Sequence, residues 1–357
     1  MGRRAGPTER IWLELLCFTG CARFAEWWRA GEGVILRFER VRPPRSGLFQ
    51  PLKSREIAPE RFERMLERLR RWNYDVIPIG ELADRLQRPG ARPRRFVCLT
   101  FDIGYRDFLE HAWPILKRQN APATLYVPGN FADQIGELWW LALEEVIARN
   151  DRIGLFMAGR ELRLECRSVT DKNEAFAFLS ETLSAMTTSE CSAAIRDLCA
   201  RYGVDLQAIS AQAVMTWSDI ARLAADPLLT IGSASLTYPV LSRLDLQQSE
   251  RELRMGRAVA EGAIGRPLPH LAYPHGTSDA FGRREMTLAS ELGFASAVTE
   301  EPGVIKQGEV EMMALPRILW DGRRTSLRAW RALLTGLTLK QRPGGPTAPP
   351  EADPSST

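Results

Sequence analysis

The sequence predicts an α/β fold, a distorted (β/α) barrel that carries a helical insertion. Strand-like apolar runs alternate with amphipathic helix-like runs along most of the 357 residues, which is typical of parallel βαβ units. The expected number of strands, about seven or eight, favours a barrel over an open sheet. The alternation stops between about residues 136 and 215, where helix-like runs predominate. We therefore expect a barrel over residues 31–330 and an insertion at about 136–215.

The first half of the expected barrel contains its clearest helix, residues 59–72. Phe62, Met65, Leu66 and Leu69 recur there at helical spacing on one face, and Pro59 suits a first-turn position. The elements expected in this half are, in order, strand 34–38, helix 59–72, strand 76–79, helix 81–87, strand 96–101, helix 107–119 and strand 123–127.

The second half begins with the insertion, in which helix-like runs flank one candidate hairpin. The expected elements are helix 138–149, a hairpin of strands 153–157 and 161–167, helix 191–202, helix 217–225, strand 228–231, helix 246–263, strand 268–273, helix 283–292, strand 295–298 and strand 317–320. Because the insertion interrupts the strand rhythm, we expect it to pack beside the barrel without adding a strand to it.

Both termini differ from this pattern. Residues 11–28 are apolar, but Glu14, Arg23 and Glu26 interrupt them, so residues 1–30 are expected to form an amphipathic helical segment packed on the domain and not a membrane span. Residues 341–357 are rich in proline and nearly free of apolar bulk, which predicts a disordered tail.

Charge and cysteine content exclude several classes of protein. With 48 Lys and Arg against 44 Asp and Glu, the net charge of +4 is too small to argue for nucleic acid binding. The six cysteines are scattered and do not form a disulfide or zinc-ligand pattern. Reduced thiols in a cytoplasmic protein are therefore expected.

Motif-like segments follow several of the expected strands. Residues 100–105 read TFDIGY after an apolar strand, and residues 231–241 read IGSASLTYPVL. Further segments of this kind are LAYPHG at 271–276, GFASAVT at 293–299, LPRI at 315–318 and, near the start, LRFERVRPP at 36–44.

In this order the segments resemble the polysaccharide deacetylase family (NodB homology, carbohydrate esterase family four), over roughly residues 31–320. The resemblance implies a deacetylase-type barrel whose first motif, TFDDGY in the family, contains two adjacent aspartates, a general base and a metal ligand. A second motif adds two histidines, and the ligands hold a divalent ion such as zinc. Asp102 matches the base position, and the amide of His275 matches a position that helps hold the oxyanion.

The implied metal ligands are replaced in this sequence. Their positions hold Ile103, Ala234 and Tyr238, while the flanking residues of both motifs still match the family. Isoleucine and alanine offer no lone pair, and a phenol is a poor zinc ligand. Metal lowers the pKa of bound water to about 7, an effect worth up to about 12 kcal/mol, whereas a general base supplies about 10²–10⁴-fold, or about 3–5 kcal/mol. We therefore expect no metal cofactor. Asp102 is either a vestigial base that keeps a role in binding, or an N-cap or loop residue that closes the turn after its strand.

Three readings of the function follow. The first is a catalytically inactive deacetylase-like protein that binds an acetylated amino-sugar glycan or regulates a partner. The second is an active N-deacetylase with an altered site, for which a relocated set of Asp102, His275 and Glu39 is conceivable. The third is a scaffold in exopolysaccharide assembly. Candidate binding residues are His275, Tyr105, Tyr238, Tyr273 and Arg317, with Trp139 and Trp140 as further aromatic candidates, and no protein partner is identified.

Overall fold

The computed structural model describes residues 31–87, 94–157, 160–320, 327–334 and 336. The expected N-terminal helical segment at 1–30 and the expected tail at 341–357 lie outside these residues. No helix in the part of the chain that is described is long and apolar enough to cross a bilayer.

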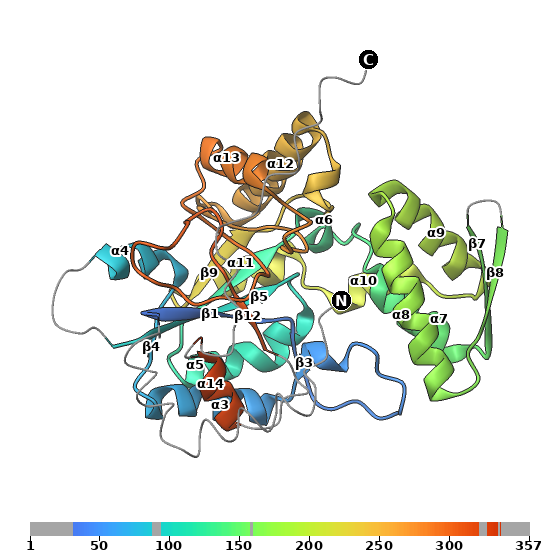
Figure 1. The fold of residues 1–357 in the computed structure, drawn as a ribbon, viewed down its shortest axis with the longest axis horizontal. Helices are drawn as coiled ribbons and strands as arrows, with labels where there is room; N and C mark the ends of the chain where they lie inside the picture. Colours follow the sequence, from blue (N-terminus) through green and yellow to red (C-terminus); the bar gives the residue numbers. More distant parts are fainter. Residues whose placement is uncertain (1–30, 88–93, 158–159, 321–326, 335, 337–357) are drawn as a thin grey trace, which may run out of the picture.

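The centre of the molecule is a curled parallel sheet (Figure 1). Its strand order is β11-β10-β9-β6-β5-β1-β12, and β4 also pairs with β5. The strands are β1 (Gly33–Phe38), β4 (Asp75–Val76), β5 (Phe96–Asp102), β6 (Ala123–Val127), β9 (Leu229–Ser233), β10 (His270–Ala272), β11 (Ser296–Val298) and β12 (Ile318–Leu319). A parallel bridge from Val298 to Leu315 leads from one end of this order toward the other, so the sheet forms a distorted, partly open barrel.

Helices cover the outer face of the sheet. They are α3 (Pro59–Arg71), α4 (Leu82–Gln87), α5 (Trp113–Arg118), α6 (Gly129–Ala132), α11 (Trp217–Ala224), α12 (Leu246–Ile264), α13 (Arg283–Glu291) and α14 (Leu327–Leu334). Short helical turns are η1 (Lys53–Arg55), η2 (Ile79–Glu81) and η4 (Leu241–Arg243), and β2 (Arg40–Val41) pairs with β3 (Glu56–Ile57). The apolar face of α3 is buried through Phe62, Met65, Leu66 and Leu69, as its spacing predicts.

The helix expected at 107–119 differs from the prediction at its start. Its first residues form a π-helical segment, η3 (Phe108–Ala112), and the α-helix α5 begins only at Trp113. Pro114 has no amide proton to donate to the carbonyl of Glu110, so a regular α-helix through this point would lose a hydrogen bond. The wider π-turn is one of the usual ways in which a helix accommodates such an interruption.

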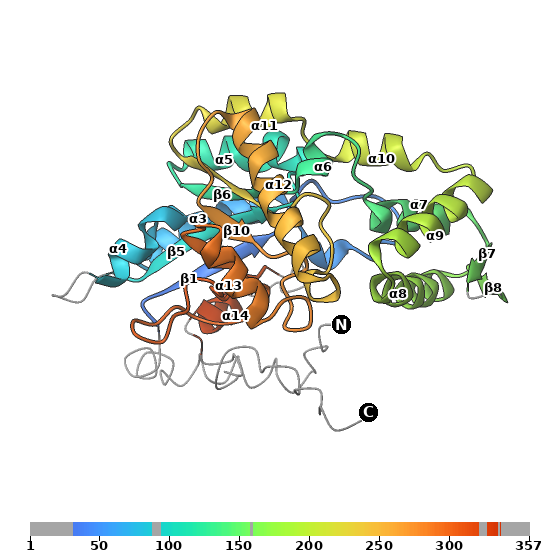
Figure 2. The ribbon, with the colours of Figure 1, turned by 90° about the horizontal axis from the view of Figure 1, so that it is seen from above.

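Residues 136–215 fold mainly into helices that lie beside the sheet (Figures 1 and 2). The elements are α7 (Trp139–Arg149), the antiparallel pair β7 (Arg152–Met157) and β8 (Arg160–Glu165), α8 (Val169–Ala185), α9 (Thr188–Arg201) and α10 (Leu206–Ala213). Capping boxes at Ser168 and Thr187 fix the starts of α8 and α9. The apolar cluster of this insertion also takes in barrel residues such as Leu52, Ile103 and Phe131, and the insertion contributes no strand to the main sheet.

Polar contacts attach the insertion to the barrel. The indole Nε1 of Trp140 donates to the hydroxyl of Tyr105 at 2.8 Å, directly after the turn that follows β5. Arg243 Nη1 donates to the carbonyl of Ser184 at 2.6 Å, near the end of α8. Because both barrel residues come after the carboxyl ends of their strands, the insertion flanks that end of the barrel, where active sites of such folds are built.

Candidate functional site

The residues singled out from the sequence gather at the carboxyl ends of the strands. Asp102 is the last residue of β5 and Ile103 follows it. Ala234 follows β9 directly, Tyr238 comes four residues later, and His275 comes three residues after β10. We call this end of the barrel the mouth.

Asp102 is buried between two arginines. Its Oδ2 accepts from Arg37 Nε at 2.5 Å, and Arg317 donates from Nη1 to Oδ1 at 2.7 Å and from Nη2 to Oδ2 at 3.0 Å. The side chains of Arg37, Asp102 and Arg317 are 7%, 3% and 1% exposed. Three of the roughly four acceptor positions of the carboxylate are therefore taken by guanidinium groups.

Further charged side chains extend the contacts of Asp102 with Arg37 and Arg317 into a network with equal numbers of both charges. Arg37 Nη2 lies 2.8 Å from Glu300 Oε1 and 3.6 Å from Glu39 Oε2. Arg55 Nη1 contacts both oxygens of Glu39 at 3.3 Å. The guanidinium groups of Arg37, Arg55 and Arg317 thus face the carboxylates of Asp102, Glu39 and Glu300, which we call the mouth network. Opposite charges in equal number make its burial tolerable.

The network sets the ionisation of its members. Burial alone would raise the pKa of Asp102, but Arg317 and Arg37 outweigh it and hold the pKa below the ordinary aspartate value. Burial disfavours the charged form of Arg37, yet Glu300 and Asp102 raise its pKa above the usual range. Burial raises the pKa of Glu300 despite the nearby Arg37. Asp102 is therefore a firmly ionised partner of two cations.

Apolar packing takes up the positions at which the family resemblance implies metal ligands. Ile103 is buried in the apolar cluster of the insertion, and Ala234 is buried in the cluster that fills the barrel interior. Tyr238 is half-buried and packs against both clusters, with its ring 5.9 Å from Phe131 and 5.0 Å from His275.

The backbone at these positions keeps an unusual conformation. The φ angles of Ile103, Ser235, Tyr238 and His275 are 75°, 66°, 65° and 60°. This left-handed region is uncommon for side chains other than glycine and asparagine, and an isoleucine there is an outlier. Such residues cost of order 1–3 kcal/mol each and persist only where the surroundings impose them.

The surroundings that impose the turn at 235–238 come from α12. Glu252 accepts from the amide nitrogens of Leu236 and Thr237 at 3.1 and 2.8 Å and from the Thr237 hydroxyl at 2.8 Å. A Cβ on Gly256 would lie 2.2 Å from the Ser235 carbonyl carbon, so only glycine lets the helix approach this turn. The backbone of the turn at 235–238 is therefore held by α12.

The residues present do not fit the divalent metal that the resemblance implies. Nowhere in the described ranges do three or more His, Cys, Asp or Glu side chains form a group that could hold a metal ion. The relocated set of Asp102, His275 and Glu39 is therefore not assembled as a ligand group, and the carboxylates of Asp102 and Glu39 face arginines. Burial and the nearby cation Arg55 lower the pKa of His275 to about 4, which keeps its ring neutral.

Several expected binding residues are buried and have contacts within the protein. Tyr105 is buried under the Arg40 guanidinium, which lies 4.6 Å from its ring centroid. Tyr273 is buried in a separate core, stacked on Phe281 at 4.5 Å. Trp140 is also buried, and Arg317 is fully enclosed with Asp102. The structure therefore gives these four residues packing or ion-pair roles in place of the expected ligand contact.

His275, Tyr238 and Trp139 remain half-buried and reach the surface. Arg37, Arg55 and Glu300 were not singled out from the sequence, although they belong to the mouth network. A signal for Arg37 was available, because it is the one charged residue within the strand GVILRF, all of whose residues are buried. Arg55 and Glu300 lie in segments whose sequence gives no such signal.

Asp102 also does not close a turn as a helix cap. It ends a strand, and the residue at the start of the next helical segment is Asp107, whose side chain makes no capping hydrogen bond. Asp107 instead accepts from Arg40 Nε at 2.6 Å.

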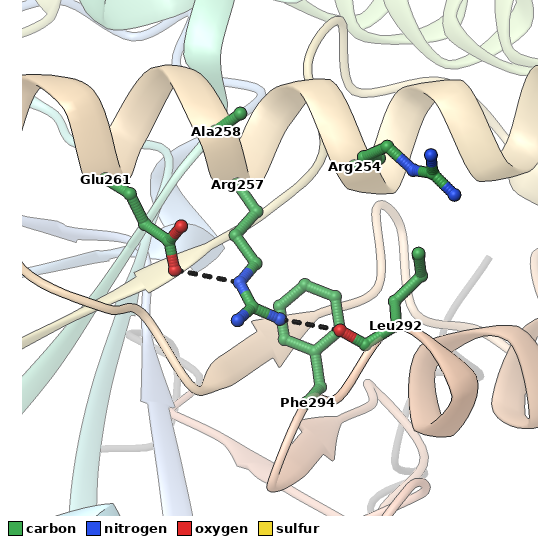
Figure 3. A pocket seen from close by; sticks show the side chains of 6 residues that line it. All are labelled: Arg254, Arg257, Ala258, Glu261, Leu292 and Phe294. Atoms are coloured by element: carbon green, nitrogen blue, oxygen red, sulfur yellow. Dashed lines mark hydrogen bonds and ion pairs between the residues drawn. The ribbon is translucent and has the colours of Figure 1, made fainter.

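Two surface hollows lie away from the mouth. One, of about 290 Å³ between α12 and α13, is shown in Figure 3. Its central side chain, Arg257, already donates to Glu261 and to the carbonyl of Leu292 and lies over the ring of Phe294. The other, of about 420 Å³, lies where α3 leads into β4. Neither gathers groups that could perform chemistry.

Comparisons with known proteins agree with this fold. A family model described as polysaccharide deacetylase matches residues 90–155, which include Asp102. No curated protein matches the chain in sequence.

Solved structures extend the similarity over the barrel and the insertion. The Streptococcus pyogenes deacetylase PplD, solved in complex with acetate, superposes with a TM-score of 0.52 at 15% identity, covering 86% of this chain and 98% of that chain. IcaB from Ammonifex degensii gives a TM-score of 0.51 at 17% identity, covering 85% and 96%. A de-N-acetylase from Aggregatibacter actinomycetemcomitans gives 0.54 at 14% identity, covering 85% and 99%.

At these identities the structural matches establish the fold and not the activity. The chain therefore has the polysaccharide deacetylase fold, and the segment around Asp102 carries the sequence signature of the polysaccharide deacetylase family.

Proposed function

We propose that this chain is a non-hydrolytic protein of the deacetylase fold that binds a glycan at the barrel mouth. The observation that carries the proposal is the state of Asp102, which both Arg37 and Arg317 hold as a buried carboxylate. A general base must reach the proton that it removes and must have a pKa near the working pH. Asp102 has its oxygens occupied and its pKa lowered, so it is poorly suited to that task.

The loss of the metal ligands supports the same proposal. In metal-dependent hydrolysis the ion generates the nucleophilic water and polarises the carbonyl. Ile103, Ala234 and Tyr238 supply no ligand set for an ion, and apolar packing occupies two of these positions.

A binding role is supported by the groups that reach the surface at the mouth. The ring of Tyr238 is half-buried between Phe131 and His275, which holds it in a fixed orientation. Half-exposed aromatic rings beside polar groups suit a sugar, whose faces are apolar and whose edges carry hydroxyls. Arg55, with 48% of its side chain exposed, adds donors at the rim.

The test uses the full chain and N-acetylglucosamine oligomers, with and without added zinc. We expect no stoichiometric zinc in the purified protein, no acetate release, and saturable binding of the oligomers by calorimetry. Tyr238→Ala should weaken that binding about tenfold, the scale of one lost aromatic contact. Trp72→Ala is the control, because Trp72 is a half-buried aromatic that ends α3, away from the mouth. Acetate release that disappears in Asp102→Asn would show an active enzyme and refute the proposal.

A further inference from the structure

Glu300 covers the mouth network from the solvent side. It lies in the loop after β11, and its amide donates to the carbonyl of Gly276 at 2.6 Å. Its carboxylate Oε1 lies 2.8 Å from Arg37 Nη2, and its side chain is 23% exposed whereas that of Arg37 is 7% exposed. Glu300 is therefore the more accessible partner of a guanidinium that is otherwise enclosed.

Other residues hold Arg37 in place. Its Nε donates to Asp102, and Asp102 is fixed from the other side by Arg317. Arg317 in turn donates from Nε to the carbonyl of Thr299 at 2.7 Å. A guanidinium anchored in this way stays oriented if the Glu300 carboxylate moves away. A preorganised guanidinium is the group that proteins use to bind carboxylates in a planar, directed manner.

Among the ion pairs of Arg37, the one with Glu300 has the most exposed partner, because Glu39 and Asp102 are 4% and 3% exposed. Burial raises the pKa of Glu300 although Arg37 is adjacent, so the loss of hydration exceeds the gain from the ion pair. The backbone of Glu300 is tied to Gly276, but its carboxylate has one described cationic partner within ion-pair distance. Rotation of the side chain toward water would restore its hydration.

The charge balance of the mouth network determines which group can replace the Glu300 carboxylate. With Glu300 turned away, the cations Arg37, Arg55 and Arg317 would face only Asp102 and Glu39. An uncompensated buried cation is costly, so the entering group has to carry a negative charge. The half-buried ring of Tyr238 also belongs to the mouth, and its centroid lies 5.0 Å from that of the His275 ring. A carboxylate attached to a sugar would satisfy both the cation and the ring.

We infer that Arg37 forms a carboxylate subsite and that the side chain of Glu300 is an intramolecular latch, which means that its own carboxylate occupies this subsite until another replaces it. The mouth then takes a uronate-type acidic sugar, whose carboxylate replaces that of Glu300 on Arg37. This inference rests on the proposed function, because it names the class of glycan that the mouth binds. The latch favours polymers over single sugars, since a tethered carboxylate competes at a high effective concentration.

The test compares glucuronate with glucose, which differ only in the carboxylate at one carbon. Binding to the full chain is measured by calorimetry for the parent protein, Glu300→Ala and Glu301→Ala. Glu301→Ala is the matched control: it removes the same charge one residue away, where the carboxylate accepts from the Ser278 amide. Glu300→Ala should bind glucuronate at least tenfold more tightly than the parent protein, because it leaves Arg37 without its competitor, and its affinity for glucose should not change.

Glu300→Gln provides a second variant, which keeps the shape of the side chain and removes its charge. It should also bind glucuronate more tightly than the parent protein. Equal glucuronate affinity in the parent protein and both Glu300 variants would overturn the latch, as would an equal gain in Glu301→Ala. If N-acetylglucosamine oligomers bind the parent protein while no variant gains affinity for glucuronate, the inference fails and the proposed function stands. If the parent protein releases acetate, the proposed function fails independently of this test.

Discussion

The two halves of the mouth differ in their chemistry. The half built from β1, β5 and β12 is charged, with Asp102 enclosed by Arg37 and Arg317. The half that carries the positions where the family resemblance implies metal ligands is apolar at Ile103 and Ala234, which pack into two different clusters. The difference shows two ways in which a buried site is stabilised: a carboxylate needs cations beside it, and positions without polar groups need apolar packing.

The strongest test of this contrast is to restore the ligands. Ile103→Asp, Ala234→His and Tyr238→His together should bind zinc with at least micromolar affinity, about 8 kcal/mol, whereas each single variant should not. The reason is that the turn at 235–238 is still held by Glu252 and Gly256. Adding Arg37→Met to the triple variant should increase its affinity for zinc further, because the change removes a nearby cation. Zinc titration of all variants provides the measurement.

The outcome of that titration separates two states of the apolar half. Strong non-additivity among the three changes would show that the backbone at these positions can bring three ligands together around one ion. A triple variant that folds but binds zinc no better than the parent protein would show that the three positions cannot form a metal site. The apolar half of the mouth would then be an ordinary part of the hydrophobic core.

The charged half is tested by Asp102→Asn. This change leaves two buried guanidinium groups without a full counter-charge and should lower the free energy of unfolding by about 3–5 kcal/mol. Urea denaturation measures it. Glu63→Gln, which weakens the exposed pair with Arg118, is the control and should cost less than about 1 kcal/mol. A catalytic carboxylate without structural partners would show little loss of stability.

The difference in stability between the parent protein and Asp102→Asn should depend on pH. Because the pKa of Asp102 is lowered by folding, its stabilising contribution is present above its unfolded pKa of about 3.9 and is lost as pH falls through the folded value. The difference in stability between the parent protein and Asp102→Asn should therefore be full at pH 7 and shrink below about pH 4. A difference that stays constant down to pH 2.5 would contradict the ion-pair account.

The smallest expected effect concerns the support of the apolar half. Glu252→Ala removes the acceptor of three hydrogen bonds and should cost about 1–3 kcal/mol. Glu250→Ala, on the same helix, loses only an exposed pair with Arg254 and should cost less than about 0.5 kcal/mol. Amide hydrogen exchange at Leu236 and Thr237 should accelerate in the first variant alone.

Local patterns were enough to predict much of the barrel. Strand 123–127 has the bounds of β6, and helix 59–72 differs from α3 by one residue, because apolar spacing and Pro59 are determined by neighbouring residues. That Ile103, Ala234 and Tyr238 stand at ligand positions of the family stays a prediction. Arg37 and Glu300 could not be assigned to the site in this way. Their roles depend on contacts with Asp102 and with each other across distant strands, and no local spacing encodes such contacts.

The placement of Arg37 has a consequence for how the mouth tolerates substitution. A histidine at Ala234 alone would bind no metal and would disturb the packing of that position. Loss of Arg37 alone would leave the buried carboxylate of Asp102 with one of its two guanidinium partners. Because each of these single changes removes a contact and gains none, the mouth is expected to accept substitutions at its half-buried residues, such as Tyr238 and His275, more easily than at these buried ones.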